Sequence, residues 1–188
     1  MGVNLIAIFP YTQLNEKLDE LIGKIEKQEY YSIKEYYEAT LSEGFPELPD
    51  FGSQWYLDDI KIRERPKLPD INAAIELSKG LVMRFGESGF EIWSLIRAFL
   101  AIKFYPKIGQ KLCEVYKEIG NEFGANECWI MGDDNPIYHS FLKGQDFATI
   151  AREVSEKNEL NELYREINEG EYAGSYEIKG YYKLKIRE

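Results

Sequence analysis

Two apolar periodicities alternate along this chain, and their alternation limits the fold to a sheet packed against helices. Residues 3–9 form a continuous β-branched and aromatic run that stops at Pro10, which predicts a buried strand. The next segment, 12–25, places five leucines and isoleucines at helical spacing, which predicts a helix capped by Thr12. With 188 residues, 44% of them hydrophobic, the chain is long enough to bury a core without disulfides.

The same reasoning predicts the remaining elements. We expect further strands over 60–65, 81–85 and 128–131, a loop over 45–52, and helices over 32–44, 70–79, 88–105 and 106–124. Two more helices begin at 146 and 158, or one kinked helix covers both, and 176–186 form a long strand or a hairpin bent at Gly180. Pairs of helices between strands do not fit a doubly wound pattern. The sequence therefore predicts a single α+β domain over 1–188, with a mixed, largely antiparallel sheet of about five or six strands covered by helices.

Two of these helices carry specific expectations. Ser32 and Glu35 have the spacing of a capping box, in which each side chain binds the other residue's backbone N–H. Residues 88–105 are apolar nearly all round, so we expect them to form a buried helix, paired with 106–124 at the centre of the core.

The charge distribution favours one class of partner. The formal net charge is −10, from 23 basic and 33 acidic residues. Residues 71–125 are almost neutral, and the excess of carboxylates lies in the two flanking parts. A surface of this sign repels phosphate backbones, so we expect no non-specific nucleic-acid binding. It attracts a basic protein instead.

Other features indicate a cytoplasmic protein without a membrane segment or cofactor. The most apolar stretch, 90–105, is short and interrupted by charges, and no secretory signal precedes residue 3. Cys113 and Cys128 lie beside large apolar residues and outside any metal-binding spacing, so we expect buried thiols. No segment carries a motif that identifies a family, and the oligomeric state is left open.

A first candidate site follows the strand predicted at 128–131. Asp133, Asp134, Asn135 and His139 place carboxylates, an amide and the chain's one imidazole within seven residues. Such groups can hold a divalent metal or supply an acid and a base, although Asp, Asn and Pro also favour plain turns. The spacing from Cys128 to His139 does not fit tetrahedral zinc, and we assign no metal.

A second candidate site is the segment Trp55, Tyr56, Asp58 and Asp59. Aromatic rings beside carboxylates suit a cation, an amine-bearing ligand or a basic side chain. The alternative is a strand start whose Trp55 joins the core. Adjacent tyrosines such as Tyr30 and Tyr31 point in different directions, so some of the chain's 14 tyrosine rings should meet solvent.

Three functional hypotheses remain. The leading one is a non-enzymatic acidic protein that engages a basic partner, as inhibitor or immunity-type proteins do. The alternative is a metal-assisted hydrolase or small-ligand domain with its site at the Gly132–Asn135 turn and His139. The third is an apolar pocket lined by Trp55, Trp93 or Trp129. The familiar nucleophile, nucleotide and metal motifs are missing from the sequence, which is why the enzymatic reading ranks second.

Overall fold

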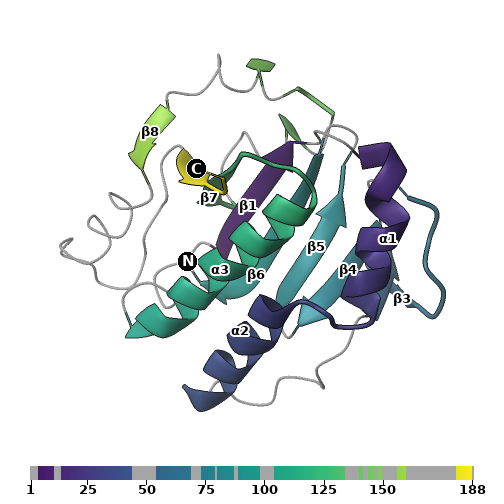
Figure 1. Cartoon of the computed structure of the whole chain (residues 1–188), viewed down its shortest axis with the longest axis horizontal. Coiled ribbons are helices and arrows are strands. Elements are labelled where there is room, and N and C mark those ends of the chain that lie inside the picture. Colours follow the sequence, from purple (N-terminus) through teal and green to yellow (C-terminus); the bar gives the residue numbers. More distant parts are fainter. Residues whose placement is uncertain are drawn as a thin grey trace.

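The protein folds as a large sheet with helices packed on one side (Figure 1). The computed structural model describes residues 4–10, 14–43, 54–68, 73–78, 80–86, 89–97, 104–133, 140–141, 144–146, 148–149, 156–159 and 181–187. Within them, the strands are β1 (Asn4–Pro10), β2 (Gln54–Leu57), β3 (Ile60–Ile62), β4 (Ala73–Ser78), β5 (Leu81–Phe85), β6 (Gly89–Arg97), β7 (Glu127–Gly132), β8 (Glu156–Glu159) and β9 (Tyr181–Lys185). The helices are α1 (Leu14–Glu26), α2 (Tyr31–Ser42) and α3 (Pro106–Glu122).

The nine described strands form one sheet in the order β3-β2-β4-β5-β6-β1-β7-β9-β8. Neighbouring strands among them pair antiparallel, apart from β8 and β9, which pair in parallel. From β2 to β6 the chain runs largely as a meander. The first strand, β1, lies between β6 and β7, near the middle of the sheet.

Both faces of the central strands are buried. On β1, Leu5, Ala7 and Phe9 point toward the helices and join the main core. Ile6 and Ile8 point to the opposite side, which we call the far face, where they pack with residues of β7 and β9. Alternating side chains of one strand point to opposite faces of a sheet, so a strand buried on both sides must be apolar throughout.

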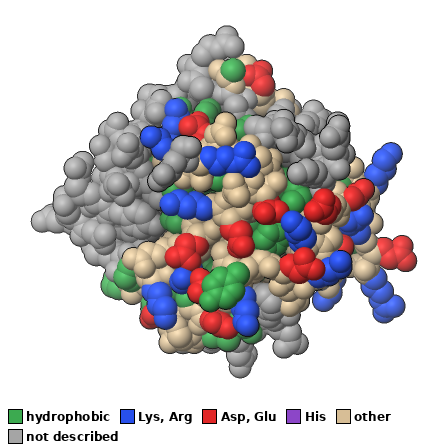
Figure 2. All heavy atoms as spheres, viewed as in Figure 1, with side chains coloured by type: hydrophobic (Ala, Val, Ile, Leu, Met, Phe, Trp, Pro, Cys, Tyr) green, Lys and Arg blue, Asp and Glu red, His purple; other side chains and the backbone are tan. Residues whose placement is uncertain are grey.

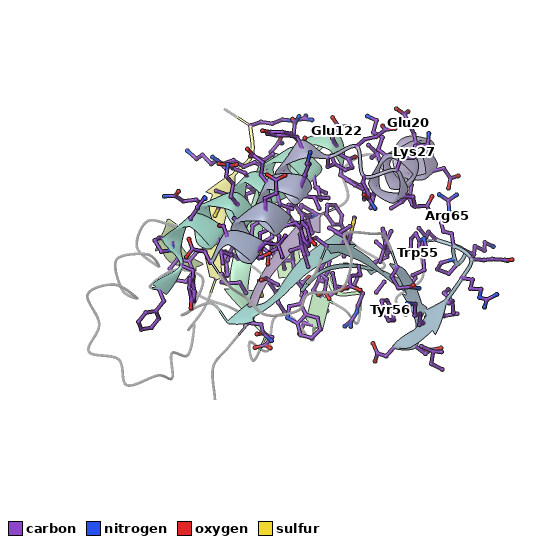
Figure 3. All side chains as sticks on the ribbon, turned by 90° about the horizontal axis from the view of Figure 1, so that it is seen from below. Glu20, Lys27, Trp55, Tyr56, Arg65 and Glu122 are labelled. Atoms are coloured by element: carbon purple, nitrogen blue, oxygen red, sulfur yellow. The ribbon has the colours of Figure 1, made fainter. Side chains whose placement is uncertain are left out.

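The three helices cover the other face, as Figure 3 shows in side view. α3 begins with Pro106, whose missing N–H would have no intrahelical partner there. Its apolar stripe packs on the sheet with residues that include Ile108, Leu112, Val115 and Ile119. No helix in the described ranges is long and apolar enough to cross a membrane.

The predicted class, α+β with a largely antiparallel sheet, is confirmed, but the strand number is higher than about five or six. The predicted helix over 88–105 is wrong, because residues 89–97 form β6, so a central pair of apolar helices is not present. Phe90 and Ile92 face the helices and Trp93 lies on the far face, which explains why large apolar residues occur on both faces of this segment.

Two other assignments also change. Residues 73–78, predicted as part of a helix, form β4, and the helix predicted to begin at 158 conflicts with β8. The strand predicted over 176–186 is confirmed for 181–185, whereas 176–180 lie outside the described residues. The loop predicted over 45–52 and the helix start after 146 also fall largely outside them, and the single-domain assignment stays a prediction.

The predicted capping box at α2 does not form. The helix begins at Tyr31, and no side chain caps it through a hydrogen bond at its N-cap, Tyr30. The Ser32 N–H donates instead to Oε2 of Glu118 on α3, at 2.9 Å, and Glu35 forms an ion pair with Lys111 at 2.8 Å. Glu118 of α3 therefore takes the place that the motif gave to Glu35 at the Ser32 N–H, and the Glu35 carboxylate pairs with Lys111 instead.

Candidate functional site

Asp133, from the first predicted site, is held by the first residue of the neighbouring strand β1. Its Oδ2 accepts a hydrogen bond from Asn4 Nδ2 at 3.0 Å, and its Oδ1 accepts one from the Asn4 backbone N–H at 3.2 Å. Both oxygens thus have partners on β1. Asp134, Asn135 and His139 lie outside the described residues, so their proximity to Asp133 stays a prediction.

The second predicted site divides between the two faces of the sheet. Trp55 is 5% exposed and packs in the main core, where its Nε1–H donates to Glu26 Oε1 at 2.8 Å. Tyr56 follows on the far face, and Figure 3 shows these neighbours on opposite sides of β2. Asp58 and Asp59 form the exposed turn between β2 and β3, with positive φ angles of 50° and 61°.

The two predicted sites do not meet through their described residues. Asp133 follows β7, and the turn at Asp58 and Asp59 follows β2, with β4, β5, β6 and β1 between those strands. Five strand spacings of about 4.8 Å separate them by roughly 24 Å. A single pocket built from Asp133 and Asp59 is therefore excluded.

Asp59 instead belongs to what we call the Arg84 cluster, formed by Arg84, Asp59, Glu91 and Trp93 on the far face. Arg84 lies opposite Glu91 in the β5–β6 pairing, with Nη1 3.7 Å from Glu91 Oε1 and Nη2 3.7 Å from Asp59 Oδ1. Its guanidinium also lies 5.7 Å from the centre of the Trp93 ring. The cation expected beside aromatic and acidic groups is thus supplied by the chain itself.

Tyr56 lies in the same cross-strand row as the Arg84 cluster. Ala74 stands directly between Tyr56 and Arg84 in the pairing of β2, β4 and β5. The Tyr56 hydroxyl donates to Glu76 Oε2 at 3.3 Å, and partial burial, followed by the charge of Glu76, raises the pKa of Tyr56. The far face thus carries acids and aromatic rings together, with Arg84 as their counter-charge.

A third group of charges, which sequence reasoning missed, lies on the helix side. We call it the Tyr30 cluster; its members are Tyr30, Lys24, Glu20, Glu29, Glu118 and Glu122. Figure 3 shows Glu20 on α1 and Glu122 at the end of α3, both on the outer side of the helix layer. Lys24 Nζ lies 2.9 Å from Glu122 Oε2 and 3.8 Å from Glu20 Oε1.

The position of Tyr30 explains the electrostatics of this cluster. Its side chain is 4% exposed, and its hydroxyl has no hydrogen-bond partner among the described residues. Burial raises the pKa of Tyr30, and the charges of Glu122, Glu118, Glu20 and Glu29 raise it further. Tyr31, its neighbour, is 67% exposed, which confirms that some tyrosine rings meet solvent, whereas the adjacent pair Tyr181 and Tyr182 is buried on both sides.

Lys24 supplies positive charge next to two of these carboxylates, Glu122 and Glu20. The hydrogen bond to Glu122 raises the pKa of Lys24, and the charges of Glu122, Glu20 and Glu29 act in the same direction. Figure 2 shows acidic and basic side chains side by side on the helix layer. Acidic and basic side chains are thus mixed on the visible part of this face.

The described residues contain no group of three or more His, Cys, Asp or Glu side chains placed to hold a metal ion. Cys128 is buried as predicted, and this burial raises the pKa of its thiol. Cys113 is only half-buried, which corrects the expectation of two buried thiols.

Comparison of the chain with protein-family models, with curated proteins and with solved structures finds no match.

Proposed function

We propose that this protein binds a basic protein partner, without catalysis, through the Tyr30 cluster. The observation that carries this proposal is the group of exposed carboxylates at Lys24, which lies 2.9 Å from Glu122 and 3.8 Å from Glu20, beside helices whose glutamates raise the pKa of the buried Tyr30. This is the action of an inhibitor or immunity-type protein, in which negative charge steers a positively charged partner to its surface.

The elements that carry the cluster support a binding role. Glu20 and Lys24 lie on α1, Glu118 and Glu122 on α3, and Tyr30 at the entrance to α2. All three helices are fixed on the sheet by apolar side chains of the main core. The carboxylates are thus held by packed elements, so a partner has little ordering entropy to offset when it binds.

The exposure of the carboxylates also supports it. The side chain of Glu20 is 66% exposed and that of Glu122 is 35% exposed, so a partner's basic group can reach both. Glu29 is exposed as well. In the Arg84 cluster, by contrast, Glu91 is 0% exposed and an arginine of the chain already faces it. The Tyr30 cluster is therefore the better site for an external cation.

The test is to capture a partner from a lysate of the native host, with wild type and with a variant in which two glutamates of the cluster are replaced by lysine. We would compare wild type with Glu20→Lys/Glu29→Lys at about 0.1 M and about 1 M salt, because the screening length falls from about 10 Å to about 3 Å over that range. Mass spectrometry identifies the captured proteins, and biolayer interferometry gives their dissociation constants.

A matched control is Glu43→Lys/Glu64→Lys, which makes the same change in net charge at exposed positions outside the cluster. We expect wild type and control to capture the same basic protein, and the cluster variant to bind it at least about tenfold more weakly. Equal binding by the two variants would reject the proposal. So would partners whose binding does not respond to salt.

A further inference from the structure

The sheet ends at β3, and no strand of the described residues pairs with its outer side. The two-residue turn at Asp58 and Asp59 makes Leu57 and Ile60 the first hydrogen-bonded pair of the β2–β3 hairpin. Because successive residues of a strand direct their backbone groups to opposite sides, the N–H and C=O of Lys61 point away from β2. The sheet therefore has an open backbone edge at Lys61.

The segment that forms and follows this edge is basic, although the chain as a whole has a net charge of −10. Residues 61–67 contain four exposed basic side chains and one acidic side chain, namely Lys61, Arg63, Arg65 and Lys67 against Glu64. We call residues 60–67 the basic edge. Figure 2 shows basic side chains projecting at the side of the molecule where Figure 1 places β3.

Most of these cations are available to a partner. Arg65 is tied to α1, where its Nη2 lies 2.9 Å from Asp19 Oδ1. The other three basic side chains form no ion pair with any residue that the structure describes. The basic edge thus carries positive charge that the described part of the chain does not neutralise.

The two faces of β3 differ in chemistry. Ile60 lies on the helix side with Ile62, and it is 67% exposed, so apolar surface is left uncovered there. Lys61 lies on the far face, opposite Tyr56 in the strand pairing. A strand added beside β3 would place one residue next to the Lys61 ammonium and its two neighbours next to the isoleucines. Acidic and apolar residues in alternation match these two faces.

Charge excludes a second copy of this chain as the added strand. Two β3 strands side by side would bring their basic edges together, and like charges across a strand pair are destabilising. Lysine on an edge strand commonly prevents pairing of this kind. The same charge attracts an acidic strand, whose carboxylates must lie beside 61–67 and away from Asp58 and Asp59 at the start of β3.

We propose that β3 is a docking edge for an extended acidic segment of a partner protein, in which carboxylates alternate with apolar residues. The segment extends the sheet through backbone hydrogen bonds with Lys61. Its carboxylates face the cations of the basic edge, and its apolar residues cover Ile60. This surface takes a partner of the opposite charge to that of the Tyr30 cluster, so the inference does not depend on the function proposed above.

The first experiment measures the affinity for a short fluorescein-labelled peptide of alternating glutamate and valine. Fluorescence anisotropy at about 0.1 M salt would compare wild type with Lys61→Glu/Arg63→Glu. The matched control is Lys107→Glu/Lys117→Glu, which makes the same change in net charge at exposed positions of α3. We expect the edge variant to bind at least about fivefold more weakly than the control. Lys61→Gln/Arg63→Gln replaces the edge variant if it does not fold.

The second experiment distinguishes an added strand from a contact between charges alone. Amide hydrogen exchange, followed by NMR with wild type saturated with the peptide, reports the N–H of Lys61 directly. Strand addition should slow exchange at Lys61 by at least about tenfold, because this N–H gains a carbonyl acceptor. Unchanged exchange at Lys61 would overturn the proposal even if the peptide binds.

Three other results would also overturn it. One is equal binding of the peptide by the edge variant and the α3 control. Another is the absence of binding to wild type at peptide concentrations up to about 1 mM. The third is tighter binding of a single-stranded oligonucleotide of the same net charge, which would assign the basic edge to nucleic acid instead.

Discussion

Asn4 and Asp133 join the start of β1 to the residue that follows β7 through three hydrogen bonds. Two run from Asn4 to the carboxylate of Asp133, and the third from the Asp133 N–H to the Asn4 carbonyl at 3.2 Å. Because both carboxylate oxygens accept hydrogen bonds from Asn4, we infer that Asp133 stabilises the end of the β1–β7 pairing.

We therefore expect Asp133→Ala to lower the free energy of unfolding by about 1–3 kcal/mol, because it removes two partly buried hydrogen bonds to a charged acceptor. Urea denaturation measures the loss. Asn4→Ala should have a similar effect, and the double variant should be less destabilised than the two single effects added together. If instead Mg²⁺ or Mn²⁺ raised the melting temperature of wild type and not of Asp133→Ala, the metal hypothesis would regain support.

The buried charge of Glu91 gives a second prediction. Glu91 is 0% exposed, and Arg84 is the cation that faces it across β5 and β6. Replacing the arginine with methionine leaves a carboxylate buried without its counter-charge, so we expect Arg84→Met to lower the unfolding free energy by about 3 to 5 kcal/mol. Chemical denaturation monitored by tryptophan fluorescence measures it.

The double variant Arg84→Met/Glu91→Leu tests the cause. It removes both charges, so it should recover much of the stability that Arg84→Met loses. Lack of recovery would show that Arg84 stabilises the sheet chiefly through its contact with Trp93 and not through Glu91.

Alkaline pH should destabilise the protein through its buried tyrosines. Burial raises the pKa of Tyr36 to about 12, although a hydrogen bond with Ser94 opposes the shift. The unfolded state ionises near pH 10, so Tyr36 contributes its full stability below pH 10 and loses it as the pH rises to about 12. Two pKa units correspond to about 3 kcal/mol.

Melting temperatures recorded between about pH 8 and about pH 12 check this. Tyr36→Phe should show a smaller decrease across that range than wild type, and so should Tyr30→Phe, because burial also raises the pKa of Tyr30. Tyr31→Phe is the comparison at an exposed ring, 67% exposed, where the hydrogen bond to Glu35 and not burial is the main cause that raises the pKa. A Tyr36→Phe profile that parallels wild type would contradict the assignment.

Gly89 is expected to tolerate no side chain. A Cβ at this position would overlap the carbonyl oxygen of Phe9 on β1 and lie 2.9 Å from Cε2 of Phe141. The backbone contact can only be relieved by moving β6 away from β1, so Gly89→Ala should cost roughly 1–3 kcal/mol. Gly23→Ala is the control, because nothing lies within 4 Å of a Cβ placed there. Alanine is favoured over glycine inside a helix, so this variant should raise the free energy of unfolding by roughly 0.5–1 kcal/mol.

The sequence predicted α1, α3 and β1 correctly because each carries a clear local signal. α1 and α3 each show one apolar stripe, and β1 ends at a proline that no helix interior accepts. β6 was misassigned because it is buried on both faces, so its sequence has no alternation to distinguish it from a buried helix.

The candidate sites show a second limit. The Ser32 N–H is bound by Glu118, 86 residues away, and Lys24 pairs with Glu122, 98 residues away. Local motifs cannot reveal such partners, because the packing of α3 on the sheet brings them together. The sequence did contain one indication of this cluster, the adjacent Tyr30 and Tyr31 with acidic neighbours. It predicted that some tyrosine rings meet solvent, but it could not show that carboxylates of α3 lie near them.

The place of β1 in the sheet has a consequence for biosynthesis. β1 leaves the ribosome first, but Phe9 pairs with Phe90 and Ile8 with Trp129. At about 5–20 residues per second, an apolar strand therefore remains without either neighbour for several seconds while the meander from β2 to β6 is made. Until those strands are made, the apolar side chains on both faces of β1 are left for chaperones that cover nascent segments.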